Sequence, residues 1–319
     1  MEAVQTKIVH NLPDQCEARR SYSGGEDKIV HANYPANVRS DGAWSSESHS
    51  AESTVTMEDR SKVSAGLMEG GKVLIVGNSL SYYNGGIRTM LRSLDPSWQT
   101  EHIVRPGASL RTLWKDGRPL KRMQKGELRA VVLQEDLPET TLAAFGEAAP
   151  LFVAAARESG ATPILLMAWP YERLSRTSLD TIIVSHARIA ASLDVQVAPA
   201  GIAFDVAGRC SAELATSLPL LAPDQEHPTV AGTYLAALCV GAALEAERRP
   251  HCPRNPHASH AAARPTAVPG GDRVLTLWPA GGPTWWPPTI HEAEAQWLWR
   301  IAALARAEWE DHRSSWPGP

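Results

Sequence analysis

The stretch Val73-Leu-Ile-Val-Gly-Asn-Ser-Leu80 decides how the chain is expected to fold. Four apolar residues followed by a glycine predict a buried β-strand that ends abruptly at a turn. Ser79 then lies at the carboxyl end of that strand, which is the edge at which open α/β sheets bind ligands. Residues 81–95 carry apolar side chains at helical spacing and predict a helix. Ser79 is therefore expected near a helix amino terminus, where free N–H groups and the dipole favour negative charge.

Short apolar runs and helical patterns alternate along the chain after Lys72. The expected strands are residues 73–76, 101–104, 130–133, 163–168 and 195–198. The expected helices are residues 81–95, 109–114, 142–159, 179–193, 230–247 and 289–310. Such alternation is typical of parallel strands joined by right-handed helical crossovers. The expected fold is a three-layer α/β/α sandwich around a mostly parallel five-stranded sheet in flavodoxin-like order.

Composition divides the chain into four segments. Residues 1–69 are rich in Ser, Glu, Asp and Asn and lack hydrophobic periodicity, so we expect a mostly disordered leader. Residues 70–249 hold the alternating pattern and form the expected α/β domain. Residues 250–288 are rich in Pro, Gly, Ala and His and are expected to be irregular. Residues 289–319 return to a helix, which either packs on the core or follows a flexible linker.

The overall composition excludes several classes of partner. A chain of 319 residues with 43% apolar content can bury a sizeable core, and a formal charge of -4 offers no basic footprint for nucleic acid. No stretch approaches the roughly 20 apolar residues of a membrane span. The first 20 residues lack the apolar core of a secretory signal, so a cytoplasmic location is expected. The four cysteines are too scattered for a disulfide framework or a zinc site, and no metal or other cofactor is expected.

The segment Asp224-Gln-Glu-His227-Pro supplies the groups that a serine nucleophile needs. A serine is a poor nucleophile unless a base accepts its proton and a third group orients that base. An Asp three residues before a His, just ahead of a helix, can fold back in a tight turn. Its carboxylate can then hold the imidazole Nδ1–H and leave Nε2 facing Ser79. Asp224 and His227 could instead simply cap the start of the following helix, and this role is compatible with catalysis.

Three blocks together resemble the SGNH/GDSL hydrolase family over roughly residues 72–247. They are Gly77-Asn-Ser-Leu80 after the first strand, a lone glycine in Arg105-Pro-Gly-Ala-Ser109 after the second, and the Asp224-x-x-His227-Pro block. The resemblance implies a metal-independent esterase or lipase with a shallow, open site. A Gly-x-Ser-x-Gly elbow is absent because Ser81 takes the last place, which counts against an ordinary α/β-hydrolase.

The resemblance also implies a role for each matched position. Ser79 would be the nucleophile and one oxyanion donor through its N–H, and Gly107 would supply a second N–H. Asp224 would be the orienting acid and His227 the base. Gly107 also has the simpler reading of a residue that permits a turn.

The block after the third strand departs from the family's pattern. The family usually has an Asn there whose amide donates to the oxyanion, whereas this chain has Val131-Val-Leu-Gln-Glu-Asp136. Strand alternation places Gln134 and Asp136 on one side and Glu135 on the other. Gln134 can donate through its amide, but an ionised Asp136 can only accept. If neither is a donor, the loss is about 3 kcal/mol of transition-state stabilisation.

Asn78, Tyr82 and Trp169 are the candidates to line the substrate site, although aromatic residues at such positions more often pack. The chain is thus expected to hydrolyse, or transfer the acyl group of, a carboxylic ester of a small or carbohydrate-like alcohol. A catalytically weakened ligand-binding or regulatory module of the same fold is the alternative. The expected partner is a small-molecule ester, and neither the substrate's identity nor the oligomeric state follows from the sequence.

Overall fold

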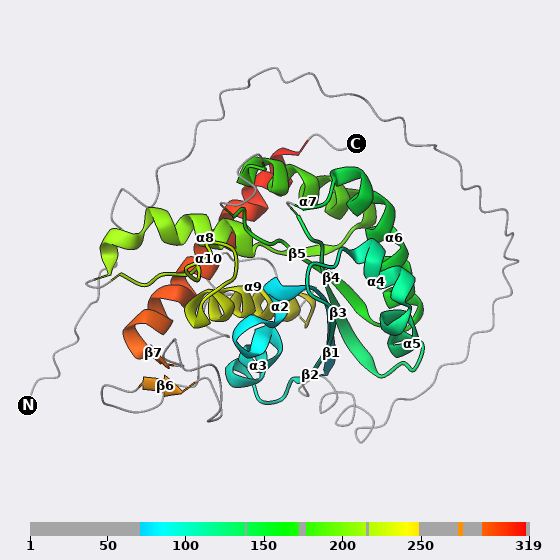
Figure 1. Cartoon of the computed structure of the whole chain (residues 1–319), viewed down its shortest axis with the longest axis horizontal. Helices are drawn as coiled ribbons and strands as arrows, with labels where there is room; N and C mark the ends of the chain where they lie inside the picture. Colours follow the sequence, from blue (N-terminus) through cyan, green and yellow to red (C-terminus); the bar gives the residue numbers. More distant parts are fainter. Residues whose placement is uncertain are drawn as a thin grey trace, which may run out of the picture. The chain divides into compact units, whose positions relative to one another are not determined.

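A computed structural model describes residues 71–137, 139–171, 177–214, 217–248, 274–276 and 289–316. Its centre is a five-stranded parallel sheet in the order β2-β1-β3-β4-β5 (Figure 1). This is the flavodoxin-like order, so the predicted fold class is confirmed. The expected leader, residues 1–69, and most of the expected irregular segment, residues 250–288, lie outside the described residues.

The strands follow the apolar runs of the sequence closely. They are β1 (Lys72–Gly77), β2 (Gln99–Val104), β3 (Leu128–Gln134), β4 (Thr162–Leu166) and β5 (Gln196–Ala198). Val73 to Val76 are fully buried, as expected of the central strand of a sheet that is covered on both faces. Because β1 pairs in parallel with both β2 and β3, the carboxyl ends of these three strands meet at one edge of the sheet.

Helices cover both faces of the sheet (Figure 1). One layer holds α3 (Gly86–Leu94) and α9 (Val230–Arg248), with α8 (Ala200–Arg209) and α10 (Glu292–Ser315) packed on α9. The other layer holds α4 (Leu110–Asp116), α5 (Arg118–Met123), α6 (Leu142–Glu158) and α7 (Leu179–Leu193). The layers leave the carboxyl edge of the sheet to loops and to the short helix α2 (Ser79–Tyr82).

The last helix packs against the core through its apolar and polar side chains alike. Ile301 and Ala305 of α10 are fully buried. The Arg306 guanidinium donates to the carbonyl of Ala242 in α9 at 2.7 Å, and Arg209 of α8 pairs with Glu308 at 2.6 Å. Ahead of α10, β7 (Thr289–His291) pairs antiparallel with β6 (Val274–Thr276), which the sequence did not indicate.

Two predicted features differ from the structure. The helix expected over residues 81–95 is interrupted: α2 passes into a 3-10 turn (Tyr83–Gly85) before α3 begins, because Asn84, Gly85 and Gly86 all have positive φ. Helix α9 is long and apolar enough to cross a membrane, contrary to the expectation that no stretch would be. However, 72% of its window Val230–Glu247 is buried, as in the core helix of a globular domain.

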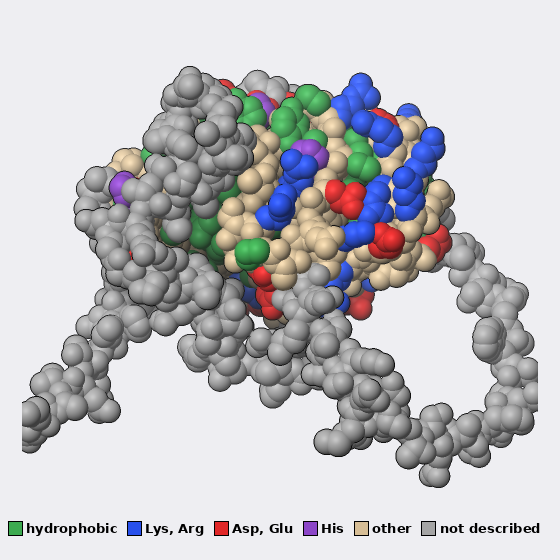
Figure 2. Space-filling view, turned by 90° about the horizontal axis from the view of Figure 1, so that it is seen from below, with side chains coloured by type: hydrophobic (Ala, Val, Ile, Leu, Met, Phe, Trp, Pro, Cys, Tyr) green, Lys and Arg blue, Asp and Glu red, His purple; other side chains and the backbone are tan. Residues whose placement is uncertain are grey.

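Charged side chains of both signs share the surface, as the face in Figure 2 shows. Several Lys and Arg side chains gather there, with Asp and Glu side chains among them. Among the described residues, Arg122 pairs with Glu101 at 2.7 Å and Arg111 with Glu147 at 3.1 Å. Of the two cysteines in the described residues, Cys239 is a buried free thiol and Cys210 is disulfide-bonded.

Candidate active site

The nucleophile turn, defined here as residues 77–81, joins β1 to α2. Asn78 is the N-cap of α2, and its side-chain oxygen accepts from the Leu80 N–H at 3.1 Å. Ser79 is the first helical residue and is half-buried, whereas Asn78 and Ser81 are each 1% exposed. A first-turn N–H has no partner inside its helix, so the Ser79 N–H is available to a ligand.

Gln134 fixes the nucleophile turn from the neighbouring strand β3. Its side-chain oxygen accepts from the Asn78 N–H at 2.9 Å and from the Ser81 hydroxyl at 2.7 Å. Its amide nitrogen donates to the Glu135 carbonyl at 2.8 Å. Because an N–H must meet an oxygen and a carbonyl must meet a donor, these contacts fix which way the amide points. The Gln134 amide thus holds the turn and is directed at the backbone rather than at an oxyanion.

Glycine at position 77 is required by this close approach. A Cβ there would lie 2.6 Å from both the Gln134 side-chain oxygen and the Ser81 hydroxyl. Real Cβ atoms do not come so near an oxygen, and Gln134 is too tightly held to move. The glycine that marked the strand end in the sequence therefore makes room for a side chain from the adjacent strand.

Asp136, one of the two residues considered for the third oxyanion donor, is an acceptor. Its carboxylate accepts from the amide of Asn78, which lies on the same side as Gln134. The alternation predicted for residues 134–136 is therefore present, since Glu135 points the other way, towards α4. Asn78 is buried and held at both ends of its amide, so it does not line an open site as predicted.

Gly107 lies in an exposed turn between β2 and α4, with φ +57. At one end of the turn the Arg105 N–H donates to the Gly77 carbonyl at 3.2 Å. At the other end the Leu110 N–H donates to the Glu135 carboxylate at 3.3 Å. The Gly107 N–H donates to no other described residue, so it too is available to a ligand.

Glu135 is a buried carboxyl group for which the sequence indicated no role. One oxygen accepts from the N–H groups of Leu110 and Asp136, while the other has no hydrogen-bond partner among the described residues. Burial raises the pKa of this carboxyl above its usual value, against the lowering effect of the Asp136 and Leu110 N–H donors. Glu135 thus ties the Gly107 turn to the end of β3.

The base turn, defined here as residues 223–228, brings Asp224 and His227 together. The imidazole Nδ1 lies 2.8 Å from the Asp224 carboxylate, whose other oxygen accepts from the N–H groups of Glu226 and His227 at 3.0 and 2.9 Å. Burial acts to raise the pKa of Asp224, but these backbone hydrogen bonds and the imidazole outweigh it and hold the pKa below its usual value. In a neutral imidazole, an ionised Asp224 facing Nδ1 favours the tautomer with its proton on Nδ1, in which Nε2 can accept a proton.

Helix α9 begins directly after the base turn. The Thr229 hydroxyl accepts from the Gly232 N–H at 3.1 Å, as an N-cap does, and Pro228 stands just before it. The start of a helix therefore ends the turn, as the sequence predicted.

Tyr83 links the two turns. Its N–H donates to the Ser79 carbonyl one helical turn earlier, and its ring stacks on the His227 imidazole with centroids 4.5 Å apart. The structure thus brings His227 to the segment that carries Ser79. Among the described residues, the Ser79 hydroxyl makes no hydrogen bond. Catalytic hydrogen bonds often tighten only when a substrate is bound.

Trp169 contacts the base turn and is 1% exposed. Its ring stacks on Phe204 at 4.1 Å, and its indole N–H donates to the Glu226 carbonyl at 3.0 Å. Trp169, a predicted lining residue, thus directs its polar atom at the backbone beside His227. Tyr82 is half-buried, and its role as a lining residue stays a prediction.

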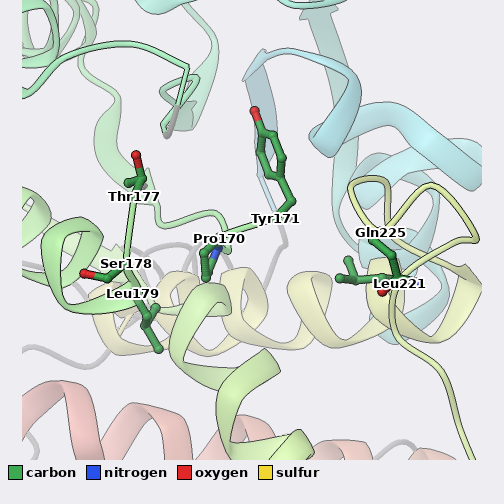
Figure 3. A pocket seen from close by; sticks show the side chains of 7 residues that line it. All are labelled: Pro170, Tyr171, Thr177, Ser178, Leu179, Leu221 and Gln225. Carbon is green, nitrogen blue, oxygen red and sulfur yellow. The ribbon is translucent and has the colours of Figure 1, made fainter. Parts of the chain in front are cut away.

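A cleft of about 380 Å³ opens next to the base turn (Figure 3). Gln225, between Asp224 and His227, and Leu221 form one side of it. Residues 177–179, at the start of α7, lie on the other side, and Pro170 and Tyr171 lie between the two. Pockets of this size hold small ligands. The part of the chain that the structure describes contains no cluster of metal-ligating side chains.

Neither a family model nor a curated protein matches the sequence. Solved structures do. A putative SGNH hydrolase from Slackia heliotrinireducens is 26% identical, covers 55% of this chain and 100% of its own, and has a TM-score of 0.47. A lipase/acylhydrolase from Enterococcus faecalis is 15% identical over 56% of this chain and 96% of its own, with a TM-score of 0.44. A variant of Axe2, a Geobacillus acetyl-xylooligosaccharide esterase, is 16% identical over 55% and 94%, with a TM-score of 0.43.

Proposed function

We propose that this chain is a serine hydrolase that cleaves carboxylic esters through Ser79, His227 and Asp224. The observation that carries the proposal is the Asp224–His227 pair, joined at 2.8 Å and stacked against the segment that begins with Ser79. A carboxylate-held imidazole near the segment that carries a serine supports this proposal, because nucleophilic catalysis needs a serine, a base and a group that orients the base. The named side chains supply each proton transfer that ester hydrolysis needs.

The proposed reaction has two halves. His227 Nε2 takes the proton of the Ser79 hydroxyl as its oxygen attacks the ester carbonyl, and then gives that proton to the departing alcohol. Asp224 stays ionised and stabilises the imidazolium that forms between these steps. Water, activated by the same imidazole, then attacks the acyl-enzyme and releases the carboxylic acid. An alcohol in place of water would make the protein an acyltransferase.

The N–H groups of Ser79 and Gly107 are the proposed oxyanion donors. Both are free of partners among the described residues, and the Ser79 N–H also lies at a helix amino terminus. Gln134 and Asp136, the residues considered for a third donor, are directed at the Glu135 backbone and at Asn78. An oxyanion hole that lacks one donor loses about 3 kcal/mol of transition-state stabilisation. We therefore expect a slow esterase.

The cleft beside Gln225 is the proposed site for the alcohol part of the ester. Its described lining mixes hydroxyl and amide groups with apolar side chains and carries no formal charge. Such a surface suits a small neutral or carbohydrate-like alcohol, because polar groups orient the ligand while apolar groups exclude water.

Hydrolysis of short-chain p-nitrophenyl esters tests the proposal. Wild-type protein should release p-nitrophenol with saturation kinetics, and Ser79→Ala should abolish the enzymatic rate. Ser93→Ala, which changes an exposed serine of α3, is the matched control and should keep the full rate. Equal turnover by wild type and Ser79→Ala would contradict the proposal.

A ligand-binding module with lost catalysis is the second candidate, and the acceptor at position 136 favours it. In that case the protein should be stabilised thermally by a ligand equally well with or without the Ser79 hydroxyl. A fluorophosphonate, which reacts only with an activated serine, should then leave Ser79 unmodified. Covalent modification of Ser79 would exclude this candidate.

A further inference from the structure

Asn84 has a backbone conformation that few residue types adopt. Its φ of 51° and ψ of 43° lie in the left-handed region, where asparagine is the non-glycine residue found most readily. It stands five positions after Ser79, in the 3-10 turn between α2 and α3. Such a conformation persists where its surroundings hold it, and it is found most often at functional sites.

The Asn84 side chain reaches the base turn. Its amide nitrogen donates to the Pro228 carbonyl at 2.6 Å, across 144 residues of sequence. A carbonyl oxygen can only accept, so the amide must present its nitrogen here. Pro228 directly follows His227, and the contact therefore joins the segment of the nucleophile to the backbone of the proposed base.

The neighbouring residue touches the imidazole itself. The Tyr83 ring lies on His227 with an angle of 25° between the two planes. The left-handed turn at Asn84 follows directly and sets the course of the chain beyond Tyr83. One face of the imidazole is thus covered by the segment that also carries the amide contact.

Two other contacts of the base turn do not reach the segment that carries Ser79. Asp224 holds His227 only within the turn itself, and Trp169 holds the Glu226 carbonyl from the side of β4 and α8. Asn84 supplies a hydrogen bond between the nucleophile segment and the residue next to His227. Misplacement of a base by about 1 Å can slow a reaction by about a hundredfold.

We propose that Asn84 is a positioning residue that sets the distance between His227 and Ser79 through its hydrogen bond to the Pro228 carbonyl. This inference rests on the proposed hydrolase function for its catalytic consequence. Its structural content, the placement of the His227 ring under Tyr83, does not depend on that function.

Asn84→Gly is the first test, because glycine keeps the left-handed backbone and removes only the amide. We expect kcat on a p-nitrophenyl ester to fall at least tenfold while KM stays within about twofold, since a displaced base weakens the chemical step. Asn84→Asp keeps the shape of the side chain but places a non-donating oxygen against a carbonyl. It should lose at least as much kcat as Asn84→Gly.

Asp194→Gly is the matched control. Asp194 also has a left-handed backbone, with φ 49° and ψ 57°, but it caps the end of α7 just before β5, away from the carboxyl edge of the sheet. This variant should keep kcat within about twofold. An equal loss of kcat in Asp194→Gly, or full activity in Asn84→Asp, would overturn the inference.

A proton NMR spectrum of the His227 ring separates this inference from the proposed function. The Hε1 resonance, assigned by its loss in His227→Gln, should be shifted by the ring current of Tyr83 in wild type and should move towards the random-coil position in Asn84→Gly. An unchanged resonance would overturn the inference even in an active enzyme. A moved resonance in a protein that hydrolyses no ester would support the positioning and count against the hydrolase.

Discussion

The nucleophile turn and the base turn are built in opposite ways. Asn78 and Gln134, which shape the nucleophile turn, are 1% and 0% exposed and lie at the ends of two neighbouring strands, β1 and β3. In the base turn the hydrogen bonds between Asp224 and His227 span four residues, and the Asp224 side chain is 46% exposed. The nucleophile turn is therefore shaped by buried groups of the core, whereas the Asp224–His227 pair forms within one exposed turn. Substitution of Gln134, which shapes the first turn, should act on stability, whereas substitution of Asp224 in the second should act on chemistry.

Asp224→Asn should have the largest effect and should leave the fold intact. The amide of an asparagine favours the wrong imidazole tautomer, so kcat should fall by about 10³- to 10⁴-fold. The free energy of unfolding should change by less than about 1 kcal/mol, because the carboxylate is largely solvated. Ester hydrolysis and urea unfolding measure the two quantities. Glu226→Gln, in the same turn, should retain activity, and a large loss of stability in Asp224→Asn would remove the contrast between the turns.

Gln134→Ala should act in the opposite sense, through the core. It leaves the Asn78 N–H, the Ser81 hydroxyl and the Glu135 carbonyl without their partner in a buried place. We expect a loss of about 3 kcal/mol in the free energy of unfolding, measured by urea titration. Gln124→Ala, at the exposed end of α5, should change it by less than about 0.5 kcal/mol. Normal stability with a hundredfold lower kcat would instead restore Gln134 as an oxyanion donor.

The pH dependence of stability should follow the core and not the base turn. Burial lowers the pKa of His186 to about 4. In the unfolded chain His186 binds a proton as the pH falls below about 6.5, whereas in the folded protein it stays neutral until about pH 4. The free energy of unfolding that His186 contributes is therefore fully present above pH 6.5 and is lost as the pH falls towards 4. The loss attributable to His186 is about 2–3 kcal/mol over this range. Urea unfolding at several pH values should show a flatter profile for His186→Asn, and an equally steep one would exclude this histidine as the cause.

Substitution of Glu135 should have the smallest effect. It tests whether the Gly107 turn, like the nucleophile turn, is held in place by buried hydrogen bonds. Glu135→Ala removes the acceptor of the Leu110 N–H, and we expect kcat to fall by about tenfold as the Gly107 turn loosens. Glu135→Gln keeps a side-chain oxygen for the same N–H and should restore most of that loss. Kinetics with a short-chain ester measure both. Equal losses in the two variants would mean that the carboxyl group's charge, and not its acceptor, is needed.

Local patterns were sufficient to predict the elements that depend on neighbouring residues. The apolar run before Gly77 gave β1, helical spacing gave α7 at Leu179–Leu193, and the Asp-x-x-His spacing anticipated the 2.8 Å contact in the base turn. Each of these depends on a few consecutive residues whose preferences agree with the fold.

The sequence-based predictions differ from the structure where a residue's conformation or partner depends on residues far away in the sequence. Helical spacing over residues 81–95 could not show that Asn84 would turn left-handed to reach Pro228. Trp169 looked like a ligand-binding residue at a strand end, but a carbonyl of the base turn takes its N–H. The roles of Gln134 and Glu135 likewise depend on partners more than 20 residues away, at Asn78 and Leu110. Only the consecutive polar residues after a buried strand gave a signal that these side chains mattered.

Covalent labelling with a fluorophosphonate, read by intact-mass spectrometry, tests whether Ser79 is a nucleophile activated by His227. We expect one adduct per wild-type chain, located on Ser79 by peptide mapping. We expect no adduct on Ser79→Ala and much slower labelling of His227→Gln, since the serine is activated by that imidazole. A folded wild-type protein that takes no label, or one labelled equally fast with and without the His227 ring, would contradict the proposed role of Ser79.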